Sequence, residues 1–481
     1  MRLKVILPLL SQVLFIVGIS ILVPLSWSFY LRDGMWVYFV VTILVFLFSS
    51  VSLYYFFPLT NEPIKPVEGY LVVTLSWLAV VFFGSLPFLL SGAMNFTDAF
   101  FETMSGFTTT GASILTDIES VAPSILMWRS MTQWLGGMGI VILFIALMLR
   151  FGPGANRIFS AEAPGTVVEK LTPRLRDTAR NLWKIYVFLT LLQILLLFVA
   201  GMTFFDSMAH TFTSIATGGF STKNASIGHY IDNNMIQVII ICFMFFGGTN
   251  FSLFYYFARK RDIRIFWQNE EFRLYVTVTV VAVLLVFFSL YFSGREIEGF
   301  LPLTALFQVV SIVTTTGYAT VDFDQWPSMA RNVMFILFFV GGSMGSTAGG
   351  IKILRILILL KATVAELFRF RHPNIVHGIK VNRVQVDDKL VINTFAFFFV
   401  YFLVVGLGTV VMSFMSLDFE GALSSVLACL GVIGPGFGVV GPVENYAGIP
   451  VFGKYFLSLL MLLGRLEIFT ILVLFFYKPH S

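Results

Sequence analysis

Long apolar segments alternate with short polar segments along the whole chain, and their lengths set the first prediction. The hydrocarbon core of a bilayer is about 30 Å thick, so a helix needs about 20 mostly apolar residues to cross it. Segments of that length occur at residues 5–30, 36–58, 70–91, 124–149, 184–204, 235–257, 275–293, 333–360, 391–415 and 455–477. The pattern therefore predicts an all-α polytopic membrane protein with ten candidate spans.

A shorter motif lies between the spans and occurs four times. Each copy has a semi-apolar stretch of ten residues, too short to cross a membrane, and then a turn that contains glycine. The stretches read DAFFETMSGF, DSMAHTFTSI, TALFQVVSIV and GALSSVLACL, and the turns open TTTG, ATGG, TTTG and GVIG. The fourth residue of each turn is Gly111, Gly219, Gly317 or Gly434. This repetition predicts four tandem helix/pore-hairpin/helix repeats around a pseudo-fourfold pore.

The repeats divide the chain into five parts. Residues 1–69 precede the first repeat and are predicted to supply two extra N-terminal transmembrane helices. The repeats themselves are assigned to residues 70–150, 151–257 with a basic cytoplasmic lead-in, 258–370 with an intramembrane loop, and 371–481. No part has the composition of a separate soluble domain.

Composition and charge support the membrane assignment and orient the chain. The 481 residues are 57% hydrophobic and 12% charged, which is more apolar surface than a soluble core buries. Lys and Arg concentrate at residues 150–184 and 352–389, on the side that the positive-inside rule makes cytoplasmic. The first span follows MRLK without a clear small-residue cleavage site, which favours a retained helix with a cytoplasmic N-terminus. The net charge of +5 is thus a topology signal and not one of nucleic-acid binding.

The turns have a chemistry suited to a cation. Non-helical backbone at membrane depth persists only where protein shields it or where it lines an aqueous path. Rings of backbone carbonyls can replace the hydration shell of a monovalent cation, and glycine tolerates the dihedral angles that this requires. Each preceding half-helix also directs the negative end of its dipole at the ion. The turns contain no Asp or Glu, which disfavours a carboxylate ring for divalent ions.

Two unusual features lie deeper in the membrane. The segment GGSMGSTAGG at 341–350 is a poor helix interior and is predicted to unwind. Arg465 lies inside an apolar segment, where an ionisable side chain normally faces a cavity or a partner. Counting helical rise from the outer ends of their spans brings the two close together, about 20 Å below the outer side. They are predicted to form a gate, although Arg465 could instead pair with Glu467.

Six motifs carry a family resemblance. They are TTTGA at 108–112, TGGF at 217–220, TTTGY at 314–318, IGPGFG at 433–438, GSTAGGIK at 345–352 and GRLE at 464–467. With these motifs the chain resembles, over essentially its whole length, the Trk/Ktr/HKT superfamily of K⁺ transporters, most closely its bacterial TrkH/TrkG membrane subunits.

The resemblance implies roles for individual residues. K⁺ would bind at filter residues Thr109, Thr110, Gly111, Thr217, Gly218, Gly219, Thr315, Thr316, Gly317, Val432, Ile433 and Gly434. The gate would comprise Gly345, Ser346, Thr347, Ala348, Gly349, Gly350, Lys352 and Arg465. The fourth turn lacks the threonines of the others, so its side-chain contribution differs. Glycine at 111, where family members that pass Na⁺ have serine, favours K⁺.

The resemblance also implies partners and a location. It implies a homodimer in the bacterial inner membrane, regulated by a cytosolic TrkA-like ring that binds NAD or adenine nucleotides. The chain itself shows no credible nucleotide site, and no organic cofactor is expected. The basic cytoplasmic loops could dock such a ring or attract anionic lipid, and the sequence leaves both open.

Two other functions compete with a channel. An H⁺- or Na⁺-coupled K⁺ symporter is the closer rival, although symporters commonly use inverted repeats, whereas these four repeats share one orientation. The second rival is an intramembrane serine hydrolase, because Gly341 to Gly345 match a nucleophile-elbow pattern around Ser343. A hydrolase needs a base beside that serine, and His210 is placed near the outer face.

Overall fold

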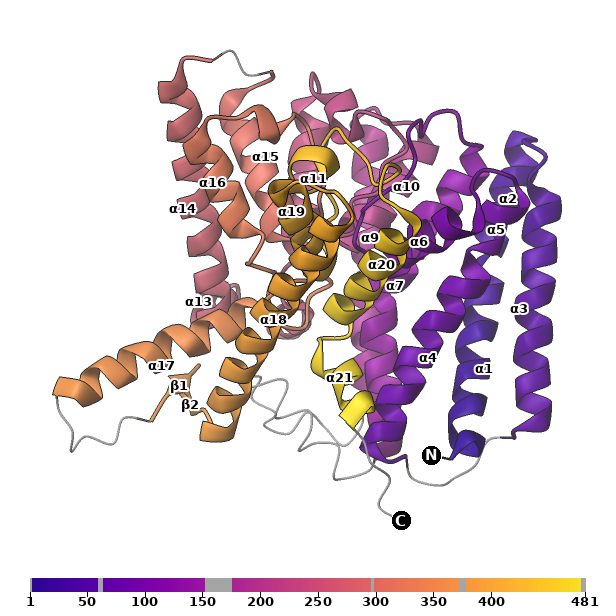
Figure 1. Cartoon of the computed structure of the whole chain (residues 1–481), viewed down its shortest axis with the longest axis horizontal. Coiled ribbons are helices and arrows are strands. Elements are labelled where there is room, and N and C mark those ends of the chain that lie inside the picture. Colours follow the sequence, from indigo (N-terminus) through magenta and orange to yellow (C-terminus); the bar gives the residue numbers. More distant parts are fainter. Residues whose placement is uncertain (1, 59–63, 152–174, 296–297, 372–377, 477–481) are drawn as a thin grey trace.

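The computed structural model describes residues 2–58, 64–151, 175–295, 298–371 and 378–476, and most of them are helical (Figure 1). Within these residues six helices are long and apolar enough to cross a membrane, or seven if one bent pair counts as a span. The two strands described are only two residues each. The predicted class, an all-α multi-pass membrane protein, is confirmed.

The N-terminal part is a helical pair beside the repeats. Its helices are α1 (Leu3–Ser20), α2 (Leu22–Leu31) and α3 (Trp36–Phe56), and α1 and α2 together form one candidate span. Gly18 lets the pair pack closely, because a Cβ there would lie 2.8 Å from the Cβ of Phe46. Asp33, between α2 and α3, accepts a hydrogen bond from the amide of Ser124, which ties the pair to the first repeat. The two predicted N-terminal helices are thus present.

The four repeats follow with the same order of elements. The first has α4 (Pro66–Gly84), α5 (Leu86–Leu90), α6 (Phe96–Phe107) and α7 (Pro123–Phe151). The second has α9 (Leu175–Val199), α10 (Phe204–Ile215), η2 (Ser226–Tyr230), α11 (Asn234–Gly247), α12 (Phe251–Lys260) and the connecting α13 (Arg264–Gln268). The third has α14 (Glu270–Ser293), α15 (Leu301–Val313), η3 (Phe323–Gln325), α16 (Ser328–Leu337) and α17 (Ile353–Arg371). The fourth has β1 (Lys380–Val381), β2 (Val384–Gln385), α18 (Asp388–Phe414), α19 (Phe419–Gly431), η4 (Gly438–Val440), α20 (Val451–Arg465) and α21 (Phe469–Phe476).

Each repeat places one short helix of 12 or 13 residues after a longer one, and we call α6, α10, α15 and α19 the pore helices. Polar caps begin three of them. The side chains of Asn95, Thr203 and Asp418 each accept a hydrogen bond from the backbone amide three residues on. The other, α15, has proline in its first turn, a residue that fits the free N-terminal amides of a helix.

The repeats are arranged in a ring. The pore helix α10 packs against α7 of the first repeat, α15 packs against α11 of the second, and α6 packs against α20 of the fourth. Each of these pore helices thus touches a helix of the preceding repeat as well as helices of its own. The packing is consistent with the predicted pseudo-fourfold arrangement, while the residue boundaries assigned to the five parts stay predictions.

Two predicted spans are not continuous helices. The segment 235–257 breaks into α11 and α12, which are bent by 97° to each other. The apolar pattern continues across the break, but Gly247 and Gly248 weaken the helix and Asn250 caps a new one through the amide of Ser252. The segment 455–477 breaks after Arg465, where Glu467 has a φ of 56°. The predicted break at 341–350 is present between α16 and α17.

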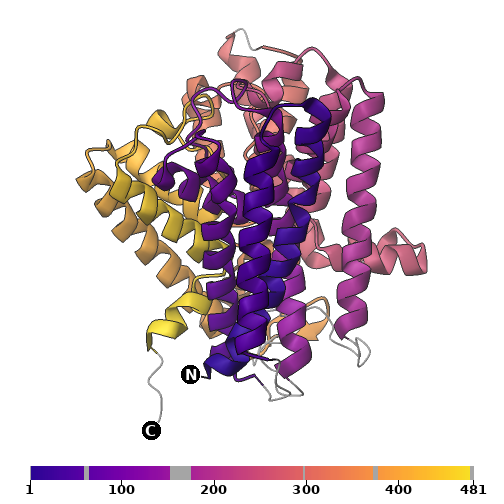
Figure 2. The same ribbon diagram turned by 90° about the vertical axis from the view of Figure 1, so that its right-hand side faces the viewer.

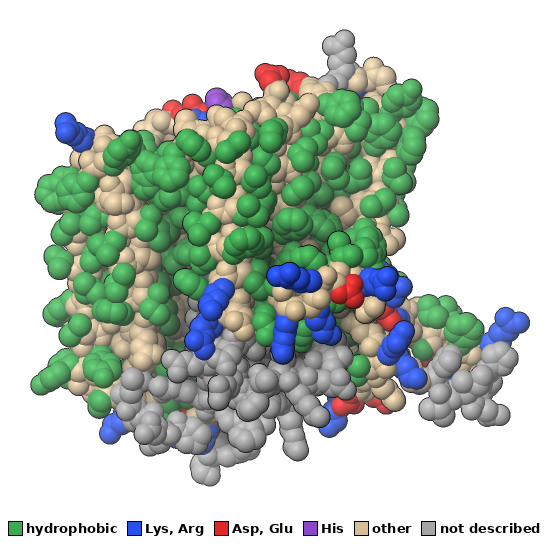
Figure 3. All heavy atoms as spheres, turned by 180° about the vertical axis from the view of Figure 1, so that it is seen from behind, with side chains coloured by type: hydrophobic (Ala, Val, Ile, Leu, Met, Phe, Trp, Pro, Cys, Tyr) green, Lys and Arg blue, Asp and Glu red, His purple; other side chains and the backbone are tan. Residues whose placement is uncertain are grey.

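The charges separate on the surface as the sequence predicts. In Figure 3 an apolar band covers most of the visible face, with Lys and Arg gathered along its lower edge and acidic side chains at the upper edge. Figures 1 and 2 place the start of α1, the end of α21 and the β1–β2 hairpin at that lower side. By the positive-inside rule, this charge distribution predicts that the lower side faces the cytoplasm. Most of the predicted basic lead-in to the second repeat, residues 152–174, lies outside the described residues.

Candidate functional site

The segment after every pore helix has the same backbone conformation. One residue adopts a left-handed conformation, and two residues later a glycine does so again. The non-glycine residues are Thr109, Thr217, Thr315 and Val432, with φ between 53° and 59°. The glycines are Gly111, Gly219, Gly317 and Gly434, with φ between 78° and 99°. Left-handed dihedral angles are costly for β-branched residues, so their recurrence in all four hairpins means that the surrounding contacts impose this shape.

Hydrogen bonding repeats with the same register. In each hairpin the amide before the glycine bonds the carbonyl five residues earlier at 2.8 Å. The four pairs are Thr110 to Ser105, Gly218 to Thr213, Thr316 to Ser311 and Ile433 to Ala428. The fourth hairpin therefore has the backbone geometry of the others although it lacks their threonines.

The four glycines bring the hairpins into a closed ring. A Cβ built on Gly111 would lie 2.2 Å from the carbonyl oxygen of Gly218, and one on Gly219 would lie 1.9 Å from that of Thr316. A Cβ on Gly317 would meet the carbonyl oxygen of Ile433 at 1.9 Å. A Cβ on Gly434 would meet that of Thr110 at 2.7 Å, which returns to the first hairpin. The predicted filter residues are thus brought together, and glycine is required because neighbouring backbones occupy the side-chain space.

The intramembrane loop, residues 338–352 between α16 and α17, lies against three of these hairpins. The amide of Gly349 donates to the hydroxyl of Thr315 at 2.7 Å, and the Thr347 hydroxyl lies 3.2 Å from that of Thr217. A Cβ on Gly349 would lie 2.4 Å from the Cβ of Val432. All three contacts involve the left-handed residue at the inner end of a pore helix. The loop therefore sits against the side of the ring where the pore helices end.

Arg465 reaches this loop as the sequence predicts. The side chain is the last of α20, is 5% exposed, and donates from Nη1 to the carbonyl oxygen of Thr347 at 2.7 Å. Its Nη2 donates to the carbonyl oxygen of Gly136 in α7 at 2.9 Å. Glu467, the alternative partner, instead forms an ion pair with Arg355. Arg465 thus joins the third, fourth and first repeats through neutral acceptors.

Two more charged side chains hold the loop. Lys352 donates from Nζ to the carbonyl oxygen of Ala348, within the loop itself. The carboxylate of Glu271, buried at the start of α14, accepts a hydrogen bond from the amide of Met344 at 2.6 Å. Lys352 is among the predicted gate residues and Glu271 is not, because Glu271 precedes an apolar span and looks like ordinary interfacial charge.

The first, second and fourth repeats share a close helix contact that the third repeat lacks. In α7, α11 and α20 a glycine faces the carbonyl oxygen at the inner end of the same repeat's pore helix. Cβ atoms on Gly136, Gly247 and Gly464 would lie 1.9, 3.0 and 2.0 Å from those oxygens. In the third repeat the helix is interrupted at this depth by the intramembrane loop. Three repeats thus have a tightly packed second helix, and one has a loop.

The sequence analysis also missed three polar side chains around the first hairpins. Glu102 on α6 and Arg129 on α7 form a buried ion pair, and Gln133 on α7 hydrogen bonds the second hairpin at Gly218 and Phe220. A signal was available, since Arg129 and Gln133 lie in a strongly apolar stretch where polar side chains are expensive. Their proximity to span ends made them look like loop residues.

The remaining candidates carry no comparable chemistry. The Ser343 hydroxyl has no hydrogen-bond partner among the described residues, and His210 bonds Asp206 and Ser221 instead. No cluster of metal-ligating His, Cys, Asp or Glu occurs in the described part of the chain. Among the described residues, no base therefore lies within hydrogen-bond reach of this serine.

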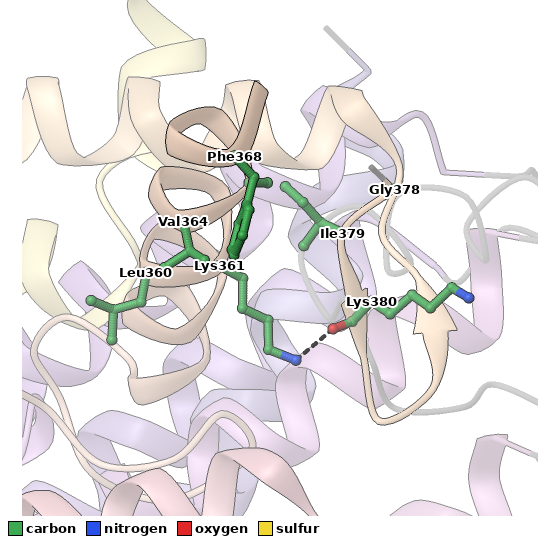
Figure 4. Close-up of a pocket in the computed structure, with 8 residues that line it drawn as sticks. Leu360, Lys361, Val364, Phe368, Gly378, Ile379 and Lys380 are labelled. Carbon is green, nitrogen blue, oxygen red and sulfur yellow. Dashed lines mark hydrogen bonds between the residues drawn. The ribbon is translucent and has the colours of Figure 1, made fainter. Parts of the chain in front are cut away.

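A cavity of about 320 Å³ lies between α17 and β1 (Figure 4). Figure 4 shows Lys361 pointing across it to the carbonyl oxygen of Lys380, at 2.6 Å, while the Lys380 side chain points away. Lys361 also forms an ion pair with Glu270 at the start of α14. The charge of Lys361 is thus balanced within the chain. None of the residues that line the cavity belongs to the ring of hairpins.

Fold and site together define a multi-pass membrane transport protein with four pore hairpins. The family model described as "TrkH: Cation transport protein" matches residues 37–481, and the chain belongs to that family. It is 37% identical to a Halomonas elongata protein named "Trk system potassium uptake protein TrkH" over 99% of this chain and 98% of the relative. It is 39% identical to the Escherichia coli K12 protein of the same name, over 86% of each chain.

A solved structure has the same fold. The crystal structure of "the Potassium Transporter TrkH from Vibrio parahaemolyticus" matches with a TM-score of 0.90 and 34% sequence identity, over 100% of this chain and 99% of that chain. The family resemblance drawn from the filter motifs is therefore confirmed. The interpretation of the chain as a transporter and not an enzyme is confirmed by the same relatives.

Proposed function

We propose that this chain takes up K⁺ by selective, channel-like conduction across the inner membrane of a bacterium. The observation that carries the proposal is the closed ring of four hairpins, each held in the same strained conformation and in contact with the next. Its relatives are named as potassium uptake proteins, which supports K⁺ as the transported ion.

The ring has the chemistry that a weakly hydrated monovalent cation needs. Backbone carbonyls of the four glycine-containing segments replace water around the ion without an acidic side chain that would favour a divalent ion. The pore helices end at the ring, so their negative dipole ends face the ion. In this proposal K⁺ is the cargo, bound at the twelve filter residues from Thr109 to Gly434, and no organic cofactor takes part.

The intramembrane loop and Arg465 act as the gate in this proposal. The loop contacts Thr217, Thr315 and Val432 directly beneath the ring, where an ion leaving the filter has to pass. Arg465 fixes the loop to α7 through the carbonyls of Thr347 and Gly136. Conduction then requires that the loop shift away from the hairpins and that these hydrogen bonds break.

Regulation and assembly complete the proposal. We expect a homodimer whose N-terminus is cytoplasmic and whose loop responds to a TrkA-like nucleotide-binding ring docked on the basic side. The word "system" in the names of the relatives supports a partner subunit. Glu271 offers a route for such a signal, because α14 begins at the cytoplasmic side and bonds the loop at Met344. A coupled symporter remains the alternative, and the shared orientation of the four pore helices favours conduction.

Ion flux into liposomes containing the purified protein tests the proposal. K⁺ and Na⁺ uptake are compared with and without an imposed proton gradient, beside a Gly111→Ser variant. K⁺-preferring flux without a proton gradient, with reduced preference in the variant, is expected. Strict dependence on a proton gradient would favour the symporter, and an unchanged preference in the variant would contradict the filter assignment.

A further inference from the structure

A polar side chain from each pore helix supports the segment that follows the filter glycine. Three of these side chains lie nine residues before the glycine, and the fourth lies ten before it. They bond hydroxyl or backbone groups two to four residues after the glycine. The pairs are Glu102 with Ser113 and Ile114, His210 with Ser221, Gln308 with Thr320 and Val321, and Ser424 with Phe437. The support position is thus shared, but its chemistry differs from repeat to repeat.

Among these four supports Glu102 is the one that forms an ion pair. Its Oε1 accepts from the Ser113 hydroxyl at 2.9 Å and from Nε of Arg129 at 2.7 Å, and its Oε2 accepts from the Ile114 amide at 2.9 Å. Glu102 is 0% exposed and the Arg129 side chain 2%. Both carboxylate oxygens are therefore used, and the first hairpin is fixed to a charged centre behind it.

Arg129 carries that connection to the second hairpin. Its Nη1 donates to the carbonyl oxygen of Ser221 at 2.8 Å, and its guanidinium lies 3.6 Å from the ring centroid of Phe220. One helical turn further along α7, Gln133 holds the Gly218 carbonyl and the Phe220 amide. The packing glycines, which lie against the pore helix of their own repeat, are Gly136 in α7, Gly247 in α11 and Gly464 in α20. Arg129 lies seven residues before Gly136. The residues seven before the other two glycines are Ile240 and Leu457, which are buried and apolar. At this position of the second helix a charged side chain therefore occurs in the first repeat and not in the second or fourth.

A buried ion pair is weak evidence for stability. Removing two charges from water is expensive, and apolar residues of similar volume often stabilise a fold as well or better. Such a pair is informative where its geometry fixes a unique arrangement. Among the described residues, the hydrogen bonds and the ring contact of these two side chains end on each other or on residues that follow a filter glycine.

We propose that the Glu102–Arg129 pair is a positioning element that sets the selectivity of the filter by fixing the first two hairpins relative to each other. The proposal rests on the filter assignment above. A carbonyl ring prefers K⁺ when its oxygens cannot close around the smaller Na⁺, which depends on how firmly the hairpins are held. Without the bridge the fold remains, but the junction between Gly111 and the second hairpin becomes adaptable and Na⁺ is accepted.

Paired variants separate this role from a contribution to folding. Arg129→Met leaves the carboxylate of Glu102 buried and unpaired, so it lowers the melting temperature. The double variant Glu102→Gln with Arg129→Met removes both charges, so the melting temperature recovers toward that of the parent. It still lacks the donor to Ser221, so selectivity stays lost. Glu68→Gln, which breaks the Arg2–Glu68 pair near the cytoplasmic end of α4, is the matched control.

The readouts are the K⁺ to Na⁺ flux ratio in liposomes and the shift of melting temperature that each ion produces in detergent. Ion binding to the folded state raises the melting temperature, so the second readout reports on the filter without flux. In the double variant we expect the flux ratio to fall about tenfold, the order of one lost hydrogen bond from a charged donor. The excess stabilisation by K⁺ over Na⁺ should fall with it.

A double variant with a recovered melting temperature and a parental flux ratio would overturn the proposal. So would a control variant that loses selectivity to the same extent. The Gly111→Ser variant distinguishes a failure of the bridge proposal from a failure of the filter assignment. If that variant changes the ratio while the double variant does not, only the bridge is refuted; if neither changes it, the filter assignment fails.

Discussion

Replacing Arg465 with methionine is expected to raise basal K⁺ flux. The substitution keeps an unbranched chain of similar length but removes the donors to the carbonyls of Thr347 and Gly136. Hydrogen bonds from charged groups contribute about 1.5–3 kcal/mol each, so losing two weakens the closed arrangement by roughly 3 kcal/mol. That corresponds to a shift of roughly a hundredfold in the ratio of closed to open molecules. The loop keeps its other bonds, so the fold should persist.

Potassium flux into liposomes at equal protein content measures this effect, with a melting curve to show that the variant is folded. Arg465→Lys separates two explanations. If Arg465 acted only as a positive charge that repels cations, lysine would do so equally well. If Arg465 acts as a tether, lysine fails, because a single ammonium cannot reach both carbonyls as the planar guanidinium does. The tether therefore predicts raised flux in both variants. Parental flux in a folded Arg465→Met protein would refute the gate.

Three further predictions follow from single contacts. Gly317→Ala should abolish K⁺ flux and the stabilisation by K⁺, because its Cβ would meet a backbone oxygen at 1.9 Å. Gly448→Ala should leave both the flux and the stabilisation by K⁺ at parental values, because a Cβ on Gly448 would meet no atom within 4 Å. Thr347→Val should raise basal flux severalfold, since two carbonyls and a hydroxyl lose their partner, and flux at parental level would contradict this. Burial raises the pKa of Asp33, but hydrogen bonds from Ser124 and others outweigh burial and lower the pKa below its ordinary value. Stability contributed by Asp33 is thus present at neutral pH and lost as pH falls below about 4. Melting curves from pH 3 to 7 should show a smaller loss in Asp33→Asn.

The ring and the gate were predictable to different degrees. A glycine at the same place in four similar segments indicates the hairpins, since the constraint on the backbone is local and appears in the sequence. The meeting of Arg465 with the loop followed from counting helical rise along two spans. The break after Arg465 and the bend at Gly248 did not follow, because apolar composition continues through both and only cap and turn residues indicate them.

The supports behind the filter were the least predictable part. Glu102 and Arg129 are 27 residues apart and meet only because α6 and α7 pack together. Arg129 is distinguished only as a charge in an apolar stretch, and Glu102 has no spacing or motif that distinguishes it from a charge near a span end. Their role depends on which carbonyls and hydroxyls the fold places beside them, and a single sequence does not contain that information.

The three packing glycines, Gly136, Gly247 and Gly464, have a consequence for how the pathway can open. Each holds its helix against a backbone oxygen, so α7, α11 and α20, in three quadrants of the ring, have little freedom to move sideways. In the quadrant with the intramembrane loop, α16 and α17 contain no glycine that could pack in this way against the pore helix of their own repeat. If the loop is the gate, as proposed, opening is asymmetric, because the loop moves while the second helices of the other three repeats stay in place. In the proposed function, ion selection is thus a property of all four repeats, whereas its control belongs to the single repeat that carries the loop.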